Sequence, residues 1–241
     1  MKAILMGRFL EDIIPYFKST GIDVVKKNPE VIITHGGDGA LLGAERKYPG
    51  IPKIPIRDIR TAPLCKEHSS YRRIFSYIKD GSLPIYDLVK LSADCGKFRT
   101  IAMNDIFIHN SNRVSAIRYK VLINGKQYGE EIVGDGAVVA TVHGSTAYYR
   151  SITHSIFRLG IGLAFSNSTE VTNHLVLPDD SVIKIILTRG PGILMADNSP
   201  DSYDIKSGEC VTIRKTPEKA IVYGLNIFMC PKCRKLRHPR E

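Results

Sequence analysis

The chain has no long uncharged apolar run. Its apolar stretches fall well short of the about 18 residues that a membrane-spanning helix needs, so we expect no membrane partner. The first residues reach Arg8, Glu11 and Asp12 after only a few apolar positions, too few for the apolar core of a signal peptide. Cysteine is also sparse, with five among 241 residues. Five is an odd number and too low a density for a disulfide scaffold, which is typical of a reducing compartment. These absences predict a cytoplasmic protein.

Two familiar nucleotide-binding motifs are missing as well. No Gly-x-x-x-x-Gly-Lys-Ser/Thr occurs, which excludes a P-loop. The Gly-Ile-Gly at 160–162 lacks the third glycine of a dinucleotide fingerprint, because Phe165 stands in its place. Any phosphate-binding turn in this chain must therefore have a different sequence from these two motifs.

The charge of the chain is strongly positive but unevenly placed. Of the net charge of +10, the last twelve residues carry +4, since they hold five basic residues and one acidic residue. A diffuse positive field attracts small polyanions such as ATP as well as nucleic acid, and a solvated surface without any partner also explains it. We expect no nucleic-acid partner.

The first 80 residues alternate between strand and helix patterns. Strands are predicted over 2–9, 29–34 and 51–56, and helices over 10–19, 41–47 and 69–79. This alternation predicts a parallel, doubly wound sheet. Pro52 and Pro55 predict that the third strand is an edge or an extended segment.

From about residue 84 the pattern changes to strand after strand. Residues 116–123 and 127–132 flank Asn124-Gly125, which is a type I′ hairpin signal. The further strands are predicted over 137–142, 175–177, 181–187, 192–196, 210–214 and 220–225. The second region is therefore predominantly β.

A glycine-rich turn stands out in the first region. The β-favouring residues 31–34 run into Gly36, Gly37, Asp38 and Gly39, and a helix-forming run follows. Glycines let backbone N–H groups approach an anion, and a helix N-terminus favours negative charge, so phosphate is the expected ligand. Asp38 fits such a site only if it binds a metal ion or takes a proton from a reacting hydroxyl, which predicts phosphoryl transfer. The alternative is an ordinary turn with a surface aspartate.

Two stretches in the second region carry polar residues near strand ends. Asn104 and Asp105 precede an apolar run, and neighbours in a strand point to opposite faces, so at most one faces a ligand unless the backbone bulges. The alternative is an Asx turn. Residues 135–148 form a buried strand that ends in a hydroxyl-rich turn with Tyr148, which suits ribose hydroxyls, a carboxamide and a ring face. The alternative is a β-turn with Tyr148 in the core.

These three stretches, in this order, resemble the motifs of the NAD kinase family. The motif residues are Gly36–Gly39, Asn104–Asp105 and the Asp-Gly-x-x-x-x-Thr-x-x-Gly-Ser-Thr-Ala-Tyr run of 135–148, and a late Asp197-Asn198 loop matches as well. Gly-Gly-Asp-Gly alone also suits diacylglycerol and sphingosine kinases and phosphofructokinases, whereas Gly-Ser-Thr-Ala-Tyr favours NAD kinase. The resemblance implies a Rossmann-like α/β domain at 1–90, a β-sandwich substrate domain at 91–225, and a tail at 226–241 that packs back on the first domain. It also implies a homodimer or homotetramer.

The resemblance implies a role for each motif residue. Asp38 would engage the 2′-hydroxyl of the adenosine ribose of NAD, with Gly36, Gly37 and Gly39 near the phosphates. Asn104 and Asp105 would hold a ribose, and Asp135 the nicotinamide end. The base and carboxamide would contact Thr146, Ala147, Tyr148 and Ser151. ATP with Mg²⁺, or polyphosphate, would donate the phosphoryl group.

The sequence also departs from the family pattern. Ala40 replaces a small polar residue, and residues 56–64 lack the glycines of the usual loop, so we expect Arg57 or Arg60 to contact phosphate instead. Residues 151–155 and 172–174 differ as well, which leaves the acceptor open. A kinase of another hydroxyl acceptor and a non-catalytic dinucleotide-binding module therefore remain as alternatives.

Histidines and cysteines supply the last candidates. We expect His35 and His143, which precede the two glycine turns, to be structural hydrogen-bonding residues rather than phosphate contacts. Cys230 and Cys233 with His238 resemble half of a zinc site, which needs a fourth ligand such as Cys65, Cys95 or a residue of another subunit.

Overall fold

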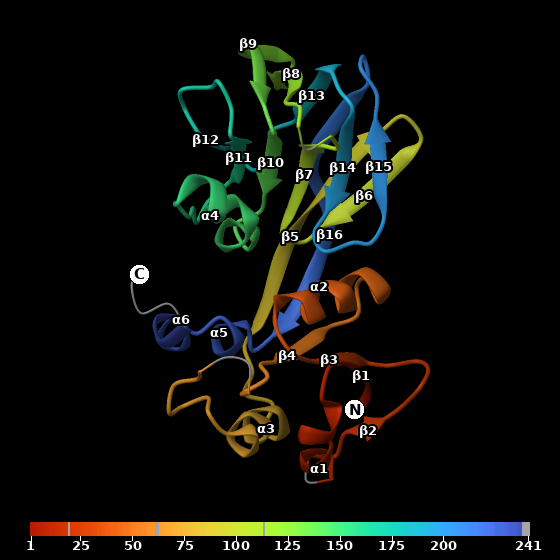
Figure 1. The fold of residues 1–241 in the computed structure, drawn as a ribbon. Helices are drawn as coiled ribbons and strands as arrows, with labels where there is room; N and C mark the ends of the chain where they lie inside the picture. Colours follow the sequence, from red (N-terminus) through yellow and green to blue (C-terminus); the bar gives the residue numbers. More distant parts are fainter. Residues whose placement is uncertain (19, 61–62, 113, 238–241) are drawn as a thin grey trace. The chain divides into compact units, whose positions relative to one another are not determined.

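The computed structural model describes residues 1–18, 20–60, 63–112 and 114–237 (Figure 1). The chain divides into two compact units: unit 1 contains Met1–Leu88 and the chain from Ala220 on, and unit 2 contains Val89–Lys219. Strands β5 (Ile85–Cys95) and β16 (Cys210–Tyr223) each contribute residues to both units. Within the described residues, none of the helices is long and apolar enough to cross a membrane.

Unit 1 is built on a parallel sheet. Its strands run in the order β2, β1, β3, β4 and the end of β16, where the first four are β2 (Asp23–Val24), β1 (Lys2–Gly7), β3 (Val31–His35) and β4 (Lys53–Ile56). Helix α2 (Asp38–Lys47) covers one face through Ala44, which packs on Ile32. Helices α1 (Ile14–Phe17) and α3 (Tyr71–Lys79) cover the other face. The doubly wound sheet predicted from the strand and helix alternation is confirmed.

Two local predictions in unit 1 are wrong. Strand β4 is not an edge, because it pairs with β3 on one side and with β16 on the other. Pro55 is tolerated because hydrogen bonds on both sides of β4 use other residues. On the β3 side, the carbonyls of Pro52 and Ile56 accept from the N–H groups of Ile32 and Gly36. On the β16 side, pairing is limited to the single position Lys53. The helix predicted over 10–19 is split by Pro15 into a 3₁₀ turn, Leu10–Asp12, and α1, and residue 19 lies outside the described residues.

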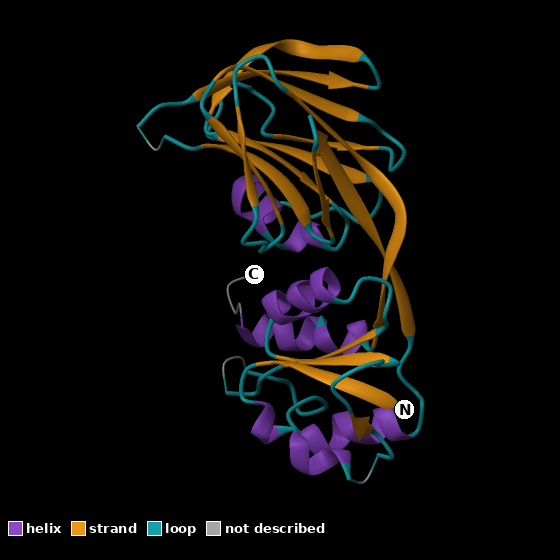
Figure 2. Cartoon of the chain, turned by 90° about the vertical axis from the view of Figure 1, so that its right-hand side faces the viewer, coloured by secondary structure: helices purple, strands orange, loops and turns teal. Residues whose placement is uncertain are grey.

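Unit 2 is a β-sandwich, and the strand ribbons of Figure 2 show its two layers. One layer belongs to the mixed sheet that contains β16, β13 (Ile183–Arg189), β8 (Ile117–Ile123) and β9 (Lys126–Gly134), with β5 and β6 (Phe98–Ala102) alongside. The other layer is antiparallel, in the order β12 (His174–Leu177), β11 (Ile161–Ser166), β10 (Gly136–Ala140), β7 (Asp105–Asn110), β14 (Gly192–Ala196) and β15 (Ser202–Ile205). The core between the layers includes Leu91, Ile108, Tyr119, Val139, Leu163, Ile185, Leu194 and Val211.

The hairpin signal in unit 2 is confirmed. Asn124 and Gly125 adopt φ values of 51° and 81°, as a type I′ turn requires, and join β8 to β9. The two strands predicted over 210–214 and 220–225 are instead one strand, β16. The residues between them are polar because this part of the strand is solvated, with only Thr216 buried.

Candidate active site

The glycine turn of unit 1 lies where β3 passes into α2. Gly36 adopts a φ of 144°, which side chains rarely tolerate, and its N–H donates to the carbonyl of Ile56 over 2.9 Å. Gly37 caps α2, Asp38 is the first residue of the helix and Gly39 the second. The Asp38 side chain is 50% exposed, so an exposed carboxylate lies at the edge of the sheet where the strands end.

Arg57 is fixed beside this turn. Its Nη2 lies 3.1 Å from Asp38 Oδ1, and a Cβ on Gly37 would lie 3.8 Å from its Nη1. Its Nε donates to the carbonyl of Phe228 over 3.0 Å, and its guanidinium lies 4.1 Å from the centre of the Phe228 ring. The Arg57 side chain is only 12% exposed, so the guanidinium is held in place before any ligand arrives.

In unit 2, Asp197 organises the segment that carries the Asn-Asp pair. Its carboxylate accepts from the backbone N–H groups of Met103, Asn104 and Asp105 over 2.8, 2.7 and 3.1 Å. Asn104 lies in the bend between β6 and β7, and Asp105 is the first residue of β7. The pair is thus not inside a regular strand, so the rule of opposite faces does not apply to it.

The turn after β10 packs directly on this segment. The Thr141 hydroxyl donates to the carbonyl of Met103 over 2.7 Å, and the Thr141 N–H donates to the carbonyl of Asn104 over 2.8 Å. A Cβ on Gly144 would lie 2.0 Å from that same Asn104 oxygen. Only glycine therefore permits the two turns to meet.

This packing leaves two buried acceptors without partners. Asn104 Oδ1 and Asp105 Oδ2 have no hydrogen-bond partner among the described residues, although both side chains are buried. Burial, with the nearby charge of Asp197, raises the pKa of Asp105 to about 7, while a hydrogen bond from the N–H of Tyr148 acts in the opposite direction. Buried acceptors without partners, beside a carboxyl of raised pKa, are typical of a ligand-binding site.

Helix α4 (Tyr148–Thr153) presents the aromatic part of the site. Tyr148 is 37% exposed and makes an edge contact with Phe107 at 5.7 Å between ring centres, whereas Tyr149 is the fully buried core residue. Thr146 and Ala147 lead into the helix, and Ser151 donates to the Tyr148 carbonyl over 2.7 Å. The alternative that Tyr148 belongs to the core is therefore wrong.

A pocket of about 470 Å³ lies beside α4, within the range of ligand pockets. All of its lining belongs to unit 2. Its lining residues are Tyr148, Ser151, Ile152, His154, Phe165, Ser166, Asn167, Ser168, Glu170 and Asn173.

Comparison with known proteins decides the family. Residues 103–225, about half of the chain, match the profile described as the ATP-NAD kinase C-terminal domain. The chain belongs to the ATP-NAD kinase family. The resemblance drawn from the sequence motifs is thereby confirmed.

Curated relatives carry the same family name. An NAD kinase of Limosilactobacillus reuteri is 32% identical over 153 residues, which are 58% of this chain but only 54% of that protein. An NAD kinase of Bordetella pertussis is 24% identical over 216 residues, 81% of this chain and 70% of that protein. The match thus spans about half the length of the first relative and a larger share of the second.

Solved structures establish the fold of this kinase family member. An NAD kinase from Archaeoglobus fulgidus in complex with ATP superposes with a TM-score of 0.75 at 20% identity, covering 97% of this chain and 99% of that one. A yeast NADH kinase complexed with NADH gives 0.77 at 17% identity, covering 92% and 83%. The predicted fold class, an α/β domain with a β-sandwich, is confirmed.

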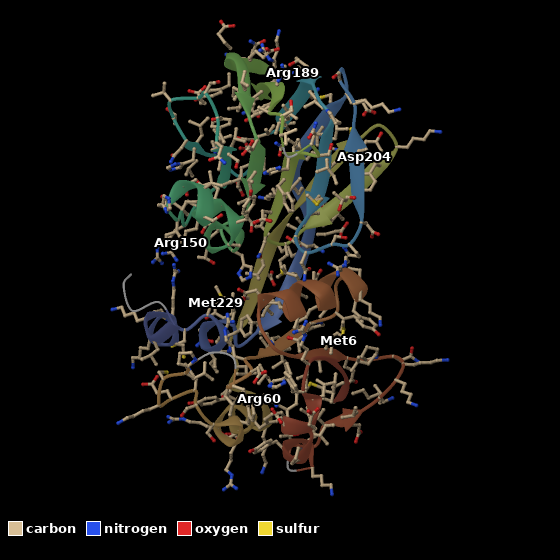
Figure 3. All side chains as sticks on the ribbon, viewed as in Figure 1. Met6, Arg60, Arg150, Arg189, Asp204 and Met229 are labelled. Carbon is tan, nitrogen blue, oxygen red and sulfur yellow. The ribbon has the colours of Figure 1, made fainter. Side chains whose placement is uncertain are left out.

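The altered loop of this family member separates the two arginine candidates. Arg60, labelled in Figure 3, lies 2.8 Å from Asp12 and 3.2 Å from Asp58, and its guanidinium lies 3.7 Å from the centre of the Phe9 ring. It is thus engaged by the carboxylates of Asp12 and Asp58. Arg57 is the arginine that lies beside Asp38.

Asp135 lies at the opposite end of β10 from the other predicted site residues of unit 2. It precedes β10, whereas the turn with Thr146 and Tyr148 follows β10, and a five-residue strand spans roughly 17 Å. Its carboxylate accepts from Asn110 over 3.3 Å and from Asn167 over 2.8 Å. Because Asn167 lines the pocket, Asp135 borders the pocket through that amide.

His35 has a structural environment. It is fully buried, its Nδ1 lies 2.6 Å from the Arg8 carbonyl, and its Nε2 lies 2.7 Å from the Tyr71 hydroxyl. Although Asp12 and Asp58 lie close enough to form a possible metal group with it, both of its ring nitrogens are already used. His35 therefore supports the fold rather than a ligand.

Sequence reasoning missed two residues that shape the site. The sequence indicates Asp197 only as part of a late substrate loop, but it holds the backbone of the Asn-Asp segment through three hydrogen bonds. The sequence indicates Gly144 only as part of the Gly-Ser-Thr-Ala-Tyr motif, but its missing side chain is what lets two turns meet. No local signal identifies the partner of either residue, because both partners lie far away in the sequence.

Proposed function

We propose that this protein is an NAD kinase that transfers the terminal phosphoryl group of ATP to the 2′-hydroxyl of the adenosine ribose of NAD. The 2′-oxygen forms the new bond to the terminal phosphorus, the bond from that phosphorus to the ADP oxygen breaks, and the hydroxyl proton passes to Asp38 or to solvent. The products are NADP and ADP. The observation that carries the proposal is the half-exposed Asp38 carboxylate at the start of α2, beside two glycines and a fixed arginine.

Asp38 is the proposed base or orienting group for the 2′-hydroxyl. Phosphoryl transfer passes through a loose transition state, so positioning and charge neutralisation contribute more than full deprotonation of the hydroxyl. Gly36, Gly37 and Gly39 leave room for phosphate oxygens near backbone N–H groups. The loop after β4 has no glycine whose backbone could approach a phosphate closely, so the Arg57 guanidinium would contact the phosphate instead. Mg²⁺ enters with ATP as part of the donor substrate.

The acceptor side of the proposal lies in unit 2. Ribose hydroxyls would donate to Asn104 Oδ1 and Asp105 Oδ2, neighbouring buried acceptors that have no partner within the described chain. The exposed ring face of Tyr148, with Thr146, Ala147 and Ser151, would contact the base and the carboxamide. Asp135 would act at the nicotinamide end through the pocket. Both oxidation states of the nicotinamide, and polyphosphate as donor, are included in the test below.

The remaining sequence predictions belong to this proposal. We propose that units 1 and 2 are the two domains expected at 1–90 with the tail 226–241, and at 91–225. A homodimer or homotetramer and a cytoplasmic location complete it. Five free cysteines support a reducing environment.

The test is a product assay. Purified protein incubated with ATP, Mg²⁺ and NAD is expected to form NADP, measured by an NADP-specific dehydrogenase, with NADH and polyphosphate in parallel reactions. Asp38→Asn should lower kcat by about 10²–10⁴-fold with NAD affinity kept, since it removes the carboxylate that accepts or orients the hydroxyl proton and that pairs with Arg57. Asp80→Asn, at an exposed aspartate after α3, is the matched control.

Other outcomes favour the alternatives. ATP turnover that requires a sugar, nucleoside or lipid hydroxyl instead of NAD would assign a different acceptor. NAD binding without any turnover would assign a non-catalytic dinucleotide-binding module. Full activity in Asp38→Asn would remove Asp38 from the mechanism.

A further inference from the structure

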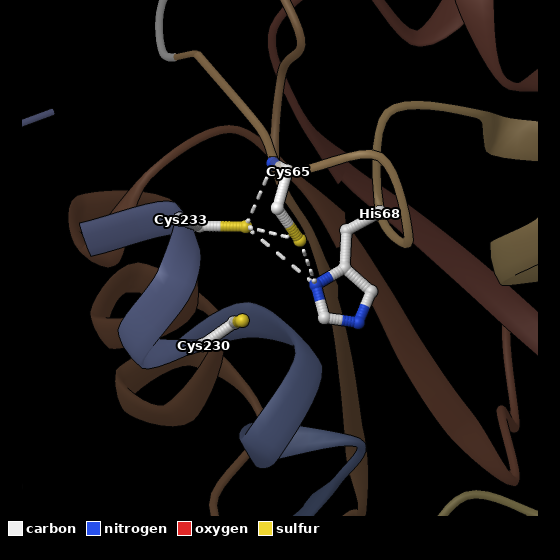
Figure 4. A group of neighbouring side chains, drawn as sticks. All are labelled: Cys65, His68, Cys230 and Cys233. Carbon is white, nitrogen blue, oxygen red and sulfur yellow. Dashed lines mark hydrogen bonds between the residues drawn. The ribbon is translucent and has the colours of Figure 1, made fainter. Parts of the chain in front are cut away.

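Four metal-ligating side chains converge in unit 1, and none of them is among the proposed kinase residues. Cys65 and His68 lie in the loop before α3, and Cys230 and Cys233 lie at the start of α6 (Pro231–Arg237), as Figure 4 shows. All four are buried, with exposures of 9%, 9%, 5% and 0%. The two segments are Cys-x-x-His and Cys-x-x-Cys, which are common spacings of zinc-binding turns.

The distances within the group are those of a tetrahedral metal site. Cys233 Sγ lies 3.5 Å from Cys65 Sγ and 3.5 Å from His68 Nδ1, and Cys65 Sγ lies 3.5 Å from the same nitrogen. The four ligand atoms all lie within 4.8 Å of one another. Zn–S bonds of about 2.3 Å and a Zn–N bond of about 2.1 Å place ligand atoms roughly 3.6–3.8 Å apart in a tetrahedron. The observed spacing therefore needs little adjustment.

The backbone around the group supports thiolate ligands. The N–H of Cys65 donates to Cys233 Sγ over 3.4 Å, and the N–H of His68 donates to the Cys65 carbonyl over 2.9 Å, which closes the first turn. Hydrogen bonds from backbone N–H groups to sulfur are the outer contacts that orient metal ligands. All four cysteine and histidine side chains are thus already turned toward one point, and the cysteines form no disulfide.

We infer that Cys65, His68, Cys230 and Cys233 bind one structural Zn²⁺ in a Cys₃His site. Four protein ligands fill the tetrahedron, so no position stays open for a water or substrate, and the role is structural rather than catalytic. His238, predicted from the sequence as a ligand, lies outside the described residues. Cys65 and His68 supply the two ligands that the tail itself lacks.

The site would fix the segment that holds Arg57. Helix α5 (Leu225–Phe228) ends two residues before Cys230, and Phe228 contacts the Arg57 guanidinium through its carbonyl and its ring. Met229 adds a contact of its sulfur to Arg57 Nη2 at 3.7 Å. Zinc would therefore hold the anchor of the arginine beside Asp38, in the same unit of the protein.

Metal analysis of the purified protein tests the inference. We expect one zinc ion per chain by inductively coupled plasma mass spectrometry, and strong thiolate-to-cobalt absorption with tetrahedral ligand-field bands after exchange into Co²⁺. His68→Ala should lose the metal, whereas His68→Cys should keep it and shift the cobalt spectrum toward a Cys₄ site. Cys95→Ser and His238→Ala are controls that should keep both the zinc and the spectrum.

If a variant fails to fold, the zinc content and the Co²⁺ spectrum of the wild-type protein still decide whether the site binds a metal. Protein that carries no zinc as purified, and takes up neither Zn²⁺ nor Co²⁺ after reduction, would overturn the inference. A disulfide between any two of these cysteines in the freshly purified protein would overturn it too. Zinc that is lost in His238→Ala but kept in His68→Ala would overturn the ligand set.

Discussion

Replacement of Asp105 by asparagine tests whether the buried carboxylate lowers the free energy of unfolding while it contributes to ligand binding. Asp105 is 4% exposed, and burial together with the charge of Asp197 raises its pKa from 3.8 to about 7. The shift is about three units, and each unit corresponds to about 1.36 kcal/mol, so the ionised side chain costs the folded protein up to about 4 kcal/mol.

The sign of the pH dependence follows from the direction of the shift. Because the folded protein binds the Asp105 proton more tightly than the unfolded chain does, this residue makes stability fall as the pH rises from about 4 to about 7. Below that range the carboxyl is neutral in both states and costs nothing. Above it the carboxylate is ionised in both states, and the full cost of burying its charge is present.

Asp105→Asn keeps the shape of the side chain and an oxygen that can accept from the N–H of Tyr148, but it carries no charge. We expect the variant to unfold with a free energy about 1–4 kcal/mol higher than wild type at pH 8, and with no significant difference at pH 4. Urea denaturation of the protein, followed by tyrosine fluorescence at pH 4, 6 and 8, measures the difference. Asp204→Asn, at an exposed aspartate of β15, should show no such trend.

A stability difference that is equal at all three pH values would refute the linkage. A variant that is less stable than wild type at pH 8 would show that the Asp105 carboxylate is a stabilising group. The expected gain in stability should coincide with weaker NAD binding, measured by calorimetry, because the amide replaces one of two acceptor oxygens.

Three further substitutions test the rest of the site. Gly144→Ala places a methyl 2.0 Å from the Asn104 carbonyl oxygen, so we expect a loss of about 3 kcal/mol in unfolding free energy; an unchanged melting temperature would contradict the close approach. Arg57→Ala should raise KM for ATP about 10- to 100-fold through loss of a charged hydrogen bond, with Arg60→Ala close to wild type in steady-state kinetics; equal effects would remove the distinction between the two arginines. Tyr148→Ala should weaken NAD binding about 10-fold in a titration with little change in stability, since the ring is 37% exposed; unaltered affinity would exclude stacking.

Local signals carried the parts of the fold that depend on short stretches. The Asn124-Gly125 turn, the glycine turn before Asp38 and the helix spacing of 71–79 all require only neighbouring residues to be recognised. The position of β4 within its sheet could not be predicted from its prolines, because that position depends on β16, which lies about 170 residues further along the chain. The continuity of β16 could not be predicted either, because all residues from 214 to 219 except Thr216 are exposed and so lack the alternation of a half-buried strand.

The candidate site shows the same division. The motif residues could be proposed from their sequence, but their supports could not, because Asp197 meets Met103 across 94 positions and Arg57 meets Phe228 across 171. The zinc ligands are a further case. The Cys-x-x-Cys pair is visible in the tail, whereas its partners lie 165 and 168 residues earlier and become candidates only in the folded chain.

The loop after β4 connects the kinase proposal to the metal proposal. A glycine loop binds phosphate through backbone N–H groups, so no side-chain conformational entropy is lost on binding. An arginine that becomes fixed on binding loses side-chain conformational entropy worth about 2 kcal/mol. Arg57 avoids losing that freedom on ligand binding because Phe228 and Met229 already hold it. Phe228 is buried, but it belongs to α5, a four-residue helix that an isolated chain would not maintain, so its position depends on the packing around it and on the segment that follows. Zinc at Cys230, the residue after Met229, would add a further constraint on this segment, so loss of the metal should weaken the proposed ATP binding through Arg57 without altering the proposed binding of NAD by unit 2.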